Sequence, residues 1–330
     1  MDNKANILLI FIFLMMASFG CQSQTIKAQS PAGPSVVKIR QAGLRFELTV
    51  NGRPYFIKGA GGGNYMDRLA QAGGNSIRTW FSSREMLDEA QAKGLTVCMG
   101  ISLRLPRQGA DYTDADFLTR QRGRIQQQVL ELKDHPALLM WGIGNEVAHQ
   151  TTPEVAELVW KEIEVISQMI KETDPNHPVI TVVAGGGRKL ADIQRLCPSL
   201  DALGINIYGK LAQIPEDLRQ NDWKKPYIIT EFGPRGWWEV SKTAWGMPIE
   251  DTSTEKSLFY RQSYQAGIAD KPNCLGSYVF LWGNKQEKTH TWFNMFLSDG
   301  TPTEMIDTMT FLWTEKWPQN RAPSIGNKKI

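Results

Sequence analysis

From residue 36 onward the chain alternates between short apolar runs and longer segments in which apolar residues recur every three or four positions. Runs rich in Val and Ile and bounded by Gly or Pro predict buried strands, whereas the second pattern predicts amphipathic helices. The expected strands cover residues 55–60, 75–80, 95–103, 137–146, 178–186, 202–209, 226–233 and 275–283. The expected helices cover residues 65–71, 83–93, 114–134, 153–174, 189–197, 214–221, 253–270 and 303–316.

This order of eight strand-then-helix units predicts an α/β protein with a single (β/α)8 TIM barrel over residues 36–330. The strands are nearly continuous apolar runs, as expected when helices cover a parallel sheet. A short β-hairpin with Asn51-Gly52 at its turn precedes the barrel. A doubly wound sheet is the alternative, but the glycine-rich stretch 59–64 lacks an acidic residue placed for a ribose.

The N-terminal segment has a different composition. An apolar run over residues 7–17 is too short to span a bilayer and is typical of a secretory signal. The following "SFGC" at 18–21 resembles the lipobox of bacterial lipoproteins, although Ser replaces the usual Leu. The resemblance implies export, lipidation of Cys21, a flexible tether over 22–35 and anchoring to the bacterial outer membrane. The lipoprotein-type signal peptide would cover residues 1–21 and end at Cys21. A plain cleaved signal peptide is the alternative.

Composition narrows the function classes further. A net charge of +3 gives no sign of a nucleic-acid surface. The histidines form no HxH pair, so no metal site is expected, and no cofactor is implied. We expect Cys98, Cys197 and Cys274 to be small buried hydrophobes, although one disulfide remains possible. The oligomeric state is not indicated.

Polar and aromatic residues stand at the ends of several predicted strands, which in a barrel meet at one face. They include two carboxylates, an arginine, two amides and a tyrosine. One carboxylic acid to protonate a leaving oxygen and one carboxylate to attack or activate water are the groups that glycoside cleavage needs. Alternatively, the two carboxylates have only a structural role. The polar and aromatic residues at the predicted strand ends are Arg78, Trp80, Asn145, Glu146, Asn206, Tyr208, Glu231 and Trp282.

Two motifs make this interpretation specific. Glu146 in "WGIGNEV" and Glu231 in "ITEFG" resemble the clan A retaining glycoside hydrolases, and most closely the TIM-barrel catalytic domain of family 2. The resemblance implies that Glu146 is the acid/base and Glu231 the nucleophile. It also implies that Asn145 binds the sugar 2-hydroxyl, while Arg78 and Tyr208 orient Glu231.

Further substrate contacts are expected around this pair. The resemblance implies that Trp282 forms the floor of the −1 subsite. Trp80 and Asn206 are expected to contact substrate because they stand at the ends of predicted strands. We expect Trp237, Trp238 and Glu287, in the loops after the seventh and eighth strands, to contact a glycan. We also expect Trp141 to give Glu146 an apolar setting. Retention implies carboxyl groups about 5–5.5 Å apart.

The expected activity is hydrolysis of a β-linked oligo- or polysaccharide through a covalent glycosyl-enzyme. A transglycosidase, which passes the same intermediate to a sugar hydroxyl, remains an alternative. So does a glycan-binding lipoprotein that has no turnover. Family 2 enzymes usually carry β-sandwich domains before the barrel, and none is visible here, so substrate specificity is not carried over.

Overall fold

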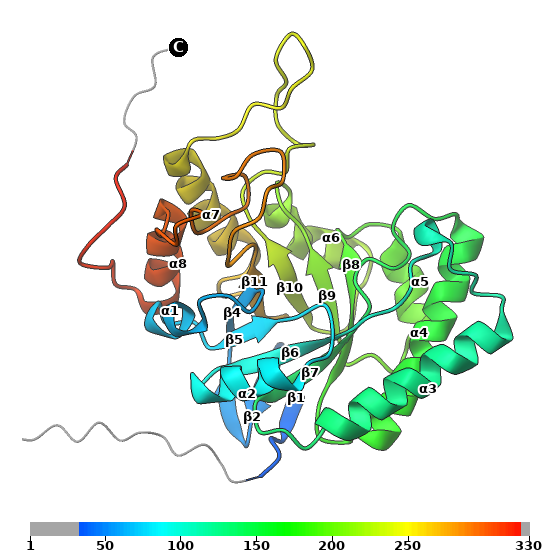
Figure 1. Ribbon diagram of the computed structural model, residues 1–330. Coiled ribbons are helices and arrows are strands. Elements are labelled where there is room, and N and C mark those ends of the chain that lie inside the picture. Colours follow the sequence, from blue (N-terminus) through cyan, green and yellow to red (C-terminus); the bar gives the residue numbers. More distant parts are fainter. Residues whose placement is uncertain (1–32, 325–330) are drawn as a thin grey trace, which may run out of the picture.

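The computed structural model describes residues 33–324, and within them eight parallel strands close into a barrel (Figure 1). Consecutive strands are neighbours, and the last pairs with the first. The predicted (β/α)8 barrel is therefore confirmed. The strands are β4 (Ile57–Gly61), β5 (Ser76–Arg78), β6 (Thr96–Ile101), β7 (Leu138–Ile143), β8 (Val179–Ala184), β9 (Ala202–Asn206), β10 (Tyr227–Phe232) and β11 (Cys274–Val279).

Helices follow the strands and surround the barrel (Figure 1). They are α1 (Met66–Gln71), α2 (Arg84–Ala92), α3 (Ala115–Leu132), α4 (Pro153–Thr173), α5 (Lys189–Leu196), α6 (Ile214–Gln220), α7 (Ser253–Gly267) and α8 (Glu304–Thr314). Local sequence fixes their starts. Asp114 and Thr152 cap α3 and α4, and Thr252 forms a reciprocal capping box with Glu255 at α7.

A three-stranded antiparallel sheet precedes the barrel, formed by β1 (Val37–Ala42), β2 (Arg45–Val50) and β3 (Arg53–Tyr55). The predicted turn at Asn51-Gly52 is confirmed, since both residues have the positive φ that such a hairpin requires. The sequence pattern missed β1, and it also assigned Tyr55 to the first barrel strand. Figure 1 shows β1 and β2 at the end of the barrel opposite the long loop that precedes α7.

Apolar side chains fill the barrel and are covered at its lower end by this sheet. Val37 and Leu48 from the sheet pack with barrel residues such as Ile57, Ile180 and Ile228, and all five are at most 2% exposed. This burial stabilises the end of the barrel that carries no candidate chemistry.

The described chain begins just before the sheet. Ser35, predicted as the last tether residue, is fully buried and donates a hydrogen bond to the Leu138 carbonyl at 2.6 Å. Cys21 and the signal segment lie outside the described residues. Between residues 33 and 324, no helix has the length and hydropathy needed to cross a membrane.

Cys98, Cys197 and Cys274 are buried and unpaired, as the sequence indicated. Burial raises the pKa of each thiol to about 12. Protonated buried thiols behave as small hydrophobic side chains rather than as nucleophiles.

Candidate active site

A cavity of about 610 Å³ opens at the carboxyl ends of the barrel strands. Both predicted catalytic carboxylates lie in its wall, together with several of the other predicted site residues. Its lining includes Asn145, Glu146, His149, Asn206, Tyr208, Glu231, Trp237, Trp238, Glu239, Phe280, Lys285 and Glu287.

Glu231, in β10, is 8% exposed and accepts hydrogen bonds from three side chains of the described chain. Arg78 Nη1 donates to Oε1 at 2.9 Å, and Trp80 Nε1 donates to the same oxygen at 3.1 Å. The Tyr208 hydroxyl donates to Oε2 at 2.9 Å. Donation to both oxygens fixes the orientation of the carboxylate, and the guanidinium stabilises its charge.

An irregularity in β10 directs Glu231 toward the cavity. Ile229 packs between the barrel and the helices, and regular alternation would place Glu231 on that same outer side. The pairing with β9 shifts register between Ile229 and Glu231. A shift of this kind re-aims the following side chain, so that both Thr230 and Glu231 take part in the site.

Glu146 follows β7 in a turn with left-handed backbone. Gly144 has φ 66° and Glu146 itself has φ 52°, a conformation that costs a non-glycine residue about 1–2 kcal/mol. The turn is held by the Glu146 amide, which donates to the Val182 carbonyl at 2.9 Å, and by Arg107, which donates to the Glu146 carbonyl at 2.6 Å. The half-buried side chain accepts from Asn206 Nδ2 at 2.8 Å. Strain of this kind is common where a side chain must be presented to a ligand.

A continuous set of hydrogen bonds connects the two carboxylates. Arg78, bound to Glu231 through Nη1, donates through Nη2 to Asn145 Oδ1 at 2.6 Å. Asn206 Nδ2 donates to the same Asn145 oxygen at 3.1 Å and to Glu146. The two carboxylates are thus joined through Arg78, Asn145 and Asn206, whose hydrogen bonds restrict the orientation of both.

Tyr208 is held as a hydrogen-bond donor by its surroundings. Burial raises the pKa of its hydroxyl well above the usual value, and the charge of Glu231 raises it further. Its ring packs against Trp238 and Phe293, with centroids 5.6 and 5.2 Å away. The phenol therefore stays protonated and donates to Glu231 across the physiological pH range.

Two expectations about tryptophans are wrong. Trp282 does not form the floor of the site, because its fully buried ring packs between Phe296 and Trp313 and its Nε1 donates to the Tyr65 carbonyl. Trp141 points outward from β7 and donates to Asp174 Oδ2 at 2.8 Å, so it does not provide the setting of Glu146.

Phe280 takes the place at the cavity wall that was expected for Trp282. It follows β11 and packs edge-on against Trp80, with ring centroids 6.0 Å apart. Trp237 and Trp238 also line the cavity and contact each other edge-on at 5.3 Å. Their aromatic faces are suited to the apolar faces of sugar rings.

Sequence reasoning also missed Glu239. Its Oε2 accepts the backbone N–H groups of Gly209 and Gly236, both at 2.8 Å, and thereby connects the loops that follow β9 and β10. A charged residue in a loop that follows two tryptophans carries no signal of such a contact.

A smaller cavity of about 300 Å³ adjoins the first one and shares Glu146 and His149 with it. Lys189, at the start of α5, is in its wall. Burial lowers the pKa of Lys189, and the charge of Glu146 opposes that shift. Glu146 therefore lines both cavities.

Comparison with known sequences relates this chain to glycoside hydrolases. A sequence model described as "Glycosyl hydrolases family 2, TIM barrel domain" matches residues 85–240, a span that includes both carboxylates. The chain is similar to the TIM barrel domain of the family 2 glycosyl hydrolases. It is 23% identical to a β-mannosidase of Bos taurus over 254 residues, and 27% identical to a β-glucuronidase of Streptococcus agalactiae over 261 residues.

These alignments cover 67% and 68% of the chain but 28% and 41% of the two relatives. The chain thus spans less than half the length of these curated relatives. Among solved structures, β-D-glucuronidase of Dictyoglomus thermophilum matches with a TM-score of 0.65 and 18% identity, covering 86% of this chain and 54% of that one. A family 2 β-galacturonidase of Eisenbergiella tayi matches with a TM-score of 0.64 and 18% identity, covering 85% and 54%. These structural matches show that the same barrel fold extends over most of the chain.

Proposed function

We propose that the protein is a retaining β-glycoside hydrolase that acts on a β-linked glycan. The observation that carries this proposal is the hydrogen-bonded connection of two carboxylates, one held by three donors and the other in a strained turn. Similarity to a β-mannosidase and to β-glucuronidases supports the same reaction class.

In the first step Glu231 attacks the anomeric carbon while Glu146 gives its proton to the glycosidic oxygen. The carbon–oxygen bond to the leaving group breaks, and a glycosyl ester forms on Glu231. In the second step Glu146 removes a proton from water, whose oxygen attacks the anomeric carbon and releases Glu231. The donors around Glu231 hold its carboxylate in one orientation for the attack.

Two adjoining cavities that share Glu146 support this assignment. Glu231 and Phe280 line only the larger one, which would hold the sugar that is attacked. The smaller one lies beside Glu146 and Lys189 and would receive the leaving group after its protonation. An acid/base residue must lie between these two positions.

The test uses the full chain with Glu231→Ala, Glu146→Ala and, as a control, Glu172→Ala on the exposed surface of α4. A panel of β-glucans, β-mannans, β-galactans and aryl β-glycosides is followed by reducing ends and product length. We expect turnover in the wild type and the control and loss of turnover in both site variants. Added azide is expected to restore turnover in the Glu231 variant and to give the α-glycosyl azide as the product. Longer products without new reducing ends would instead indicate transfer, and binding without products would overturn the enzyme assignment.

We propose further that the protein is exported and lipidated at Cys21. The apolar run and the lipobox-like "SFGC" support this proposal. Cells that express the chain are labelled with a fatty acid carrying an alkyne. Label on the wild type and its loss in Cys21→Ser are expected, whereas an unlabelled, fully released protein would overturn the anchor.

A further inference from the structure

The charge of the larger cavity is unbalanced. Among the described residues its wall carries four carboxylates but one lysine, Lys285. The carboxylates are Glu146, Glu231, Glu239 and Glu287. Arg78 is buried and forms an ion pair with Glu231, so it does not offer a free positive charge to a ligand.

Lys285 is itself paired. Its Nζ lies 2.6 Å from Glu287 Oε2 and 4.7 Å from the centre of the Phe280 ring, at the wall of the sugar site. The other oxygen of Glu287, Oε1, lies 3.4 Å from Trp237 Nε1. The two side chains are 42% and 32% exposed, and the ammonium group lies at the cavity wall with a carboxylate as its direct partner.

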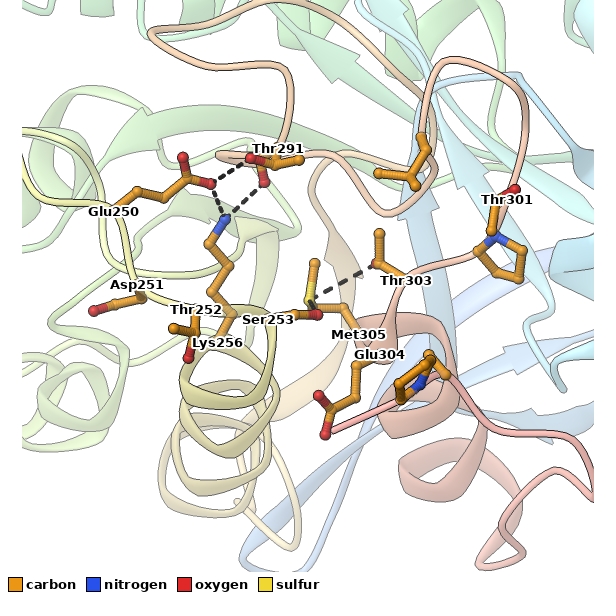
Figure 2. A pocket seen from close by; sticks show the side chains of 14 residues that line it. Glu250, Asp251, Thr252, Ser253, Lys256, Thr291, Thr301, Thr303, Glu304 and Met305 are labelled. Atoms are coloured by element: carbon orange, nitrogen blue, oxygen red, sulfur yellow. Dashed lines mark hydrogen bonds and ion pairs between the residues drawn. The ribbon is translucent and has the colours of Figure 1, made fainter. Parts of the chain in front are cut away.

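Hydrogen bonds anchor the backbone of the loop that carries Lys285 and Glu287. Asn294, which is 1% exposed, accepts from the Lys285 amide at 3.0 Å and donates to the Lys285 carbonyl at 2.6 Å. Figure 2 shows how Thr291 is held next to α7: Lys256 Nζ donates to its carbonyl at 2.7 Å, and its hydroxyl donates to Glu250 at 2.8 Å. Lys256 and Glu250 also pair with each other. Buried side chains thus anchor the backbone of the segment that carries Lys285 and Glu287.

We propose that Glu287 is a specificity residue that adapts the site to uncharged pyranosides by occupying Lys285. The inference rests on the proposed glycosidase function. An anionic sugar would have to displace Glu287 from Lys285 and would meet the remaining carboxylates at close range, because like charges in a partly desolvated site repel. A neutral sugar instead offers hydroxyl donors to the same carboxylates.

Substrate pairs that differ only at C6 test this inference: aryl β-glucoside against β-glucuronide, and aryl β-galactoside against β-galacturonide. The wild-type full chain is expected to prefer the neutral member of the pair it accepts. Glu287→Gln is expected to raise the uronide-to-neutral ratio of kcat/KM by about tenfold or more, mainly through KM, because it frees Lys285. Adding Lys285→Met to Glu287→Gln is expected to remove that gain. Glu172→Gln, which removes the same charge from the exposed surface of α4, should leave the ratio unchanged.

The single variant Lys285→Met provides a second readout if Glu287→Gln does not fold. It should leave the ratio near the wild-type value, since the lysine is already neutralised. Efficient wild-type turnover of uronides, a large loss of uronide turnover in Lys285→Met, or an unchanged ratio in folded Glu287→Gln would each overturn the inference while the glycosidase function stands. Absence of turnover on every glycoside would instead overturn the proposed function.

Discussion

Arg78 Nη1 lies 2.9 Å from Glu231 Oε1, and the two side chains are 3% and 10% exposed. The same guanidinium also reaches Asn145 through Nη2. Arg78 therefore does more than supply charge, because its planar group fixes the relative orientation of the residues at the ends of β7 and β10.

Replacing Arg78 with lysine separates these two roles. Arg78→Lys keeps a positive charge beside Glu231 but cannot bind Glu231 and Asn145 with one rigid group. We expect kcat/KM on the best aryl glycoside to fall by about 100-fold or more, with the fold retained by circular dichroism. Activity within a few-fold of the wild type would show that charge alone is sufficient.

Tyr208→Phe removes one donor to Glu231 and leaves the ring that packs on Trp238 and Phe293. Loss of one preorganised donor is expected to lower kcat by about 10- to 1000-fold with a small change in KM. The midpoint of urea unfolding should shift little. An unchanged kcat would mean that the hydroxyl has no part in the reaction.

The buried tyrosines predict an unusual response to alkali. Burial raises the pKa of seven of the eight tyrosines, namely Tyr55, Tyr112, Tyr208, Tyr227, Tyr260, Tyr264 and Tyr278. The unfolded chain ionises its tyrosines near pH 10, so the stability that protonated phenols contribute is lost as pH rises above about 10. Near-ultraviolet absorbance should show most phenols ionising together with unfolding. Gradual ionisation of seven phenols in a folded protein would contradict this prediction.

Asp174 is expected to contribute to the free energy of unfolding and to have little effect on kcat. It is 1% exposed and accepts from Trp141 Nε1 at 2.8 Å and from the Asn176 amide at 3.0 Å, and it pairs with His177 Nδ1 at 2.8 Å. Asp174→Ala leaves these buried groups without an acceptor, and a loss of about 3–5 kcal/mol in the free energy of unfolding is expected. Denaturant unfolding measures the loss, and the wild-type kcat at low temperature should be retained.

The same residue predicts part of the acid response. Burial alone would raise the pKa of Asp174, but its hydrogen bonds and the charge of His177 lower it overall. The stability that it contributes is therefore present above the unfolded value of about 3.9 and is lost as pH falls through the lowered folded value. Asp174→Asn should flatten the stability profile below about pH 4. An identical acid dependence in both proteins would exclude this contribution.

Much of the fold and the core of the site follow from the sequence pattern. Every predicted barrel strand and helix exists, because apolar runs and helical periodicity alternate clearly along the chain. Polar residues at strand ends also meet as expected, since the carboxyl ends of parallel strands share one face of a barrel. Arg78 and Asn206 meet at that face as the rule predicts, and the register shift in β10 brings Glu231 to them.

The errors have a common physical origin. A strand buried on both faces is apolar throughout, so its sequence does not reveal which side each residue faces. The pattern therefore could not show that Trp141, expected beside Glu146, and Trp282, which the resemblance places at the floor of the site, both donate their indole N–H groups away from the cavity. The register shift that turns Glu231 inward is likewise invisible in an apolar run.

The most direct test of the central claim is to trap the covalent intermediate. The full chain is incubated with an activated aryl 2-fluoro-β-glycoside of the sugar that it hydrolyses best, then digested and analysed by mass spectrometry. The fluorine slows the second step, so we predict one glycosyl group per chain, attached to the peptide that contains Glu231, and none in Glu231→Ala. Attachment to a different carboxylate, or continued turnover of the normal glycoside after full exposure without any adduct, would contradict the assignment of Glu231 as the nucleophile.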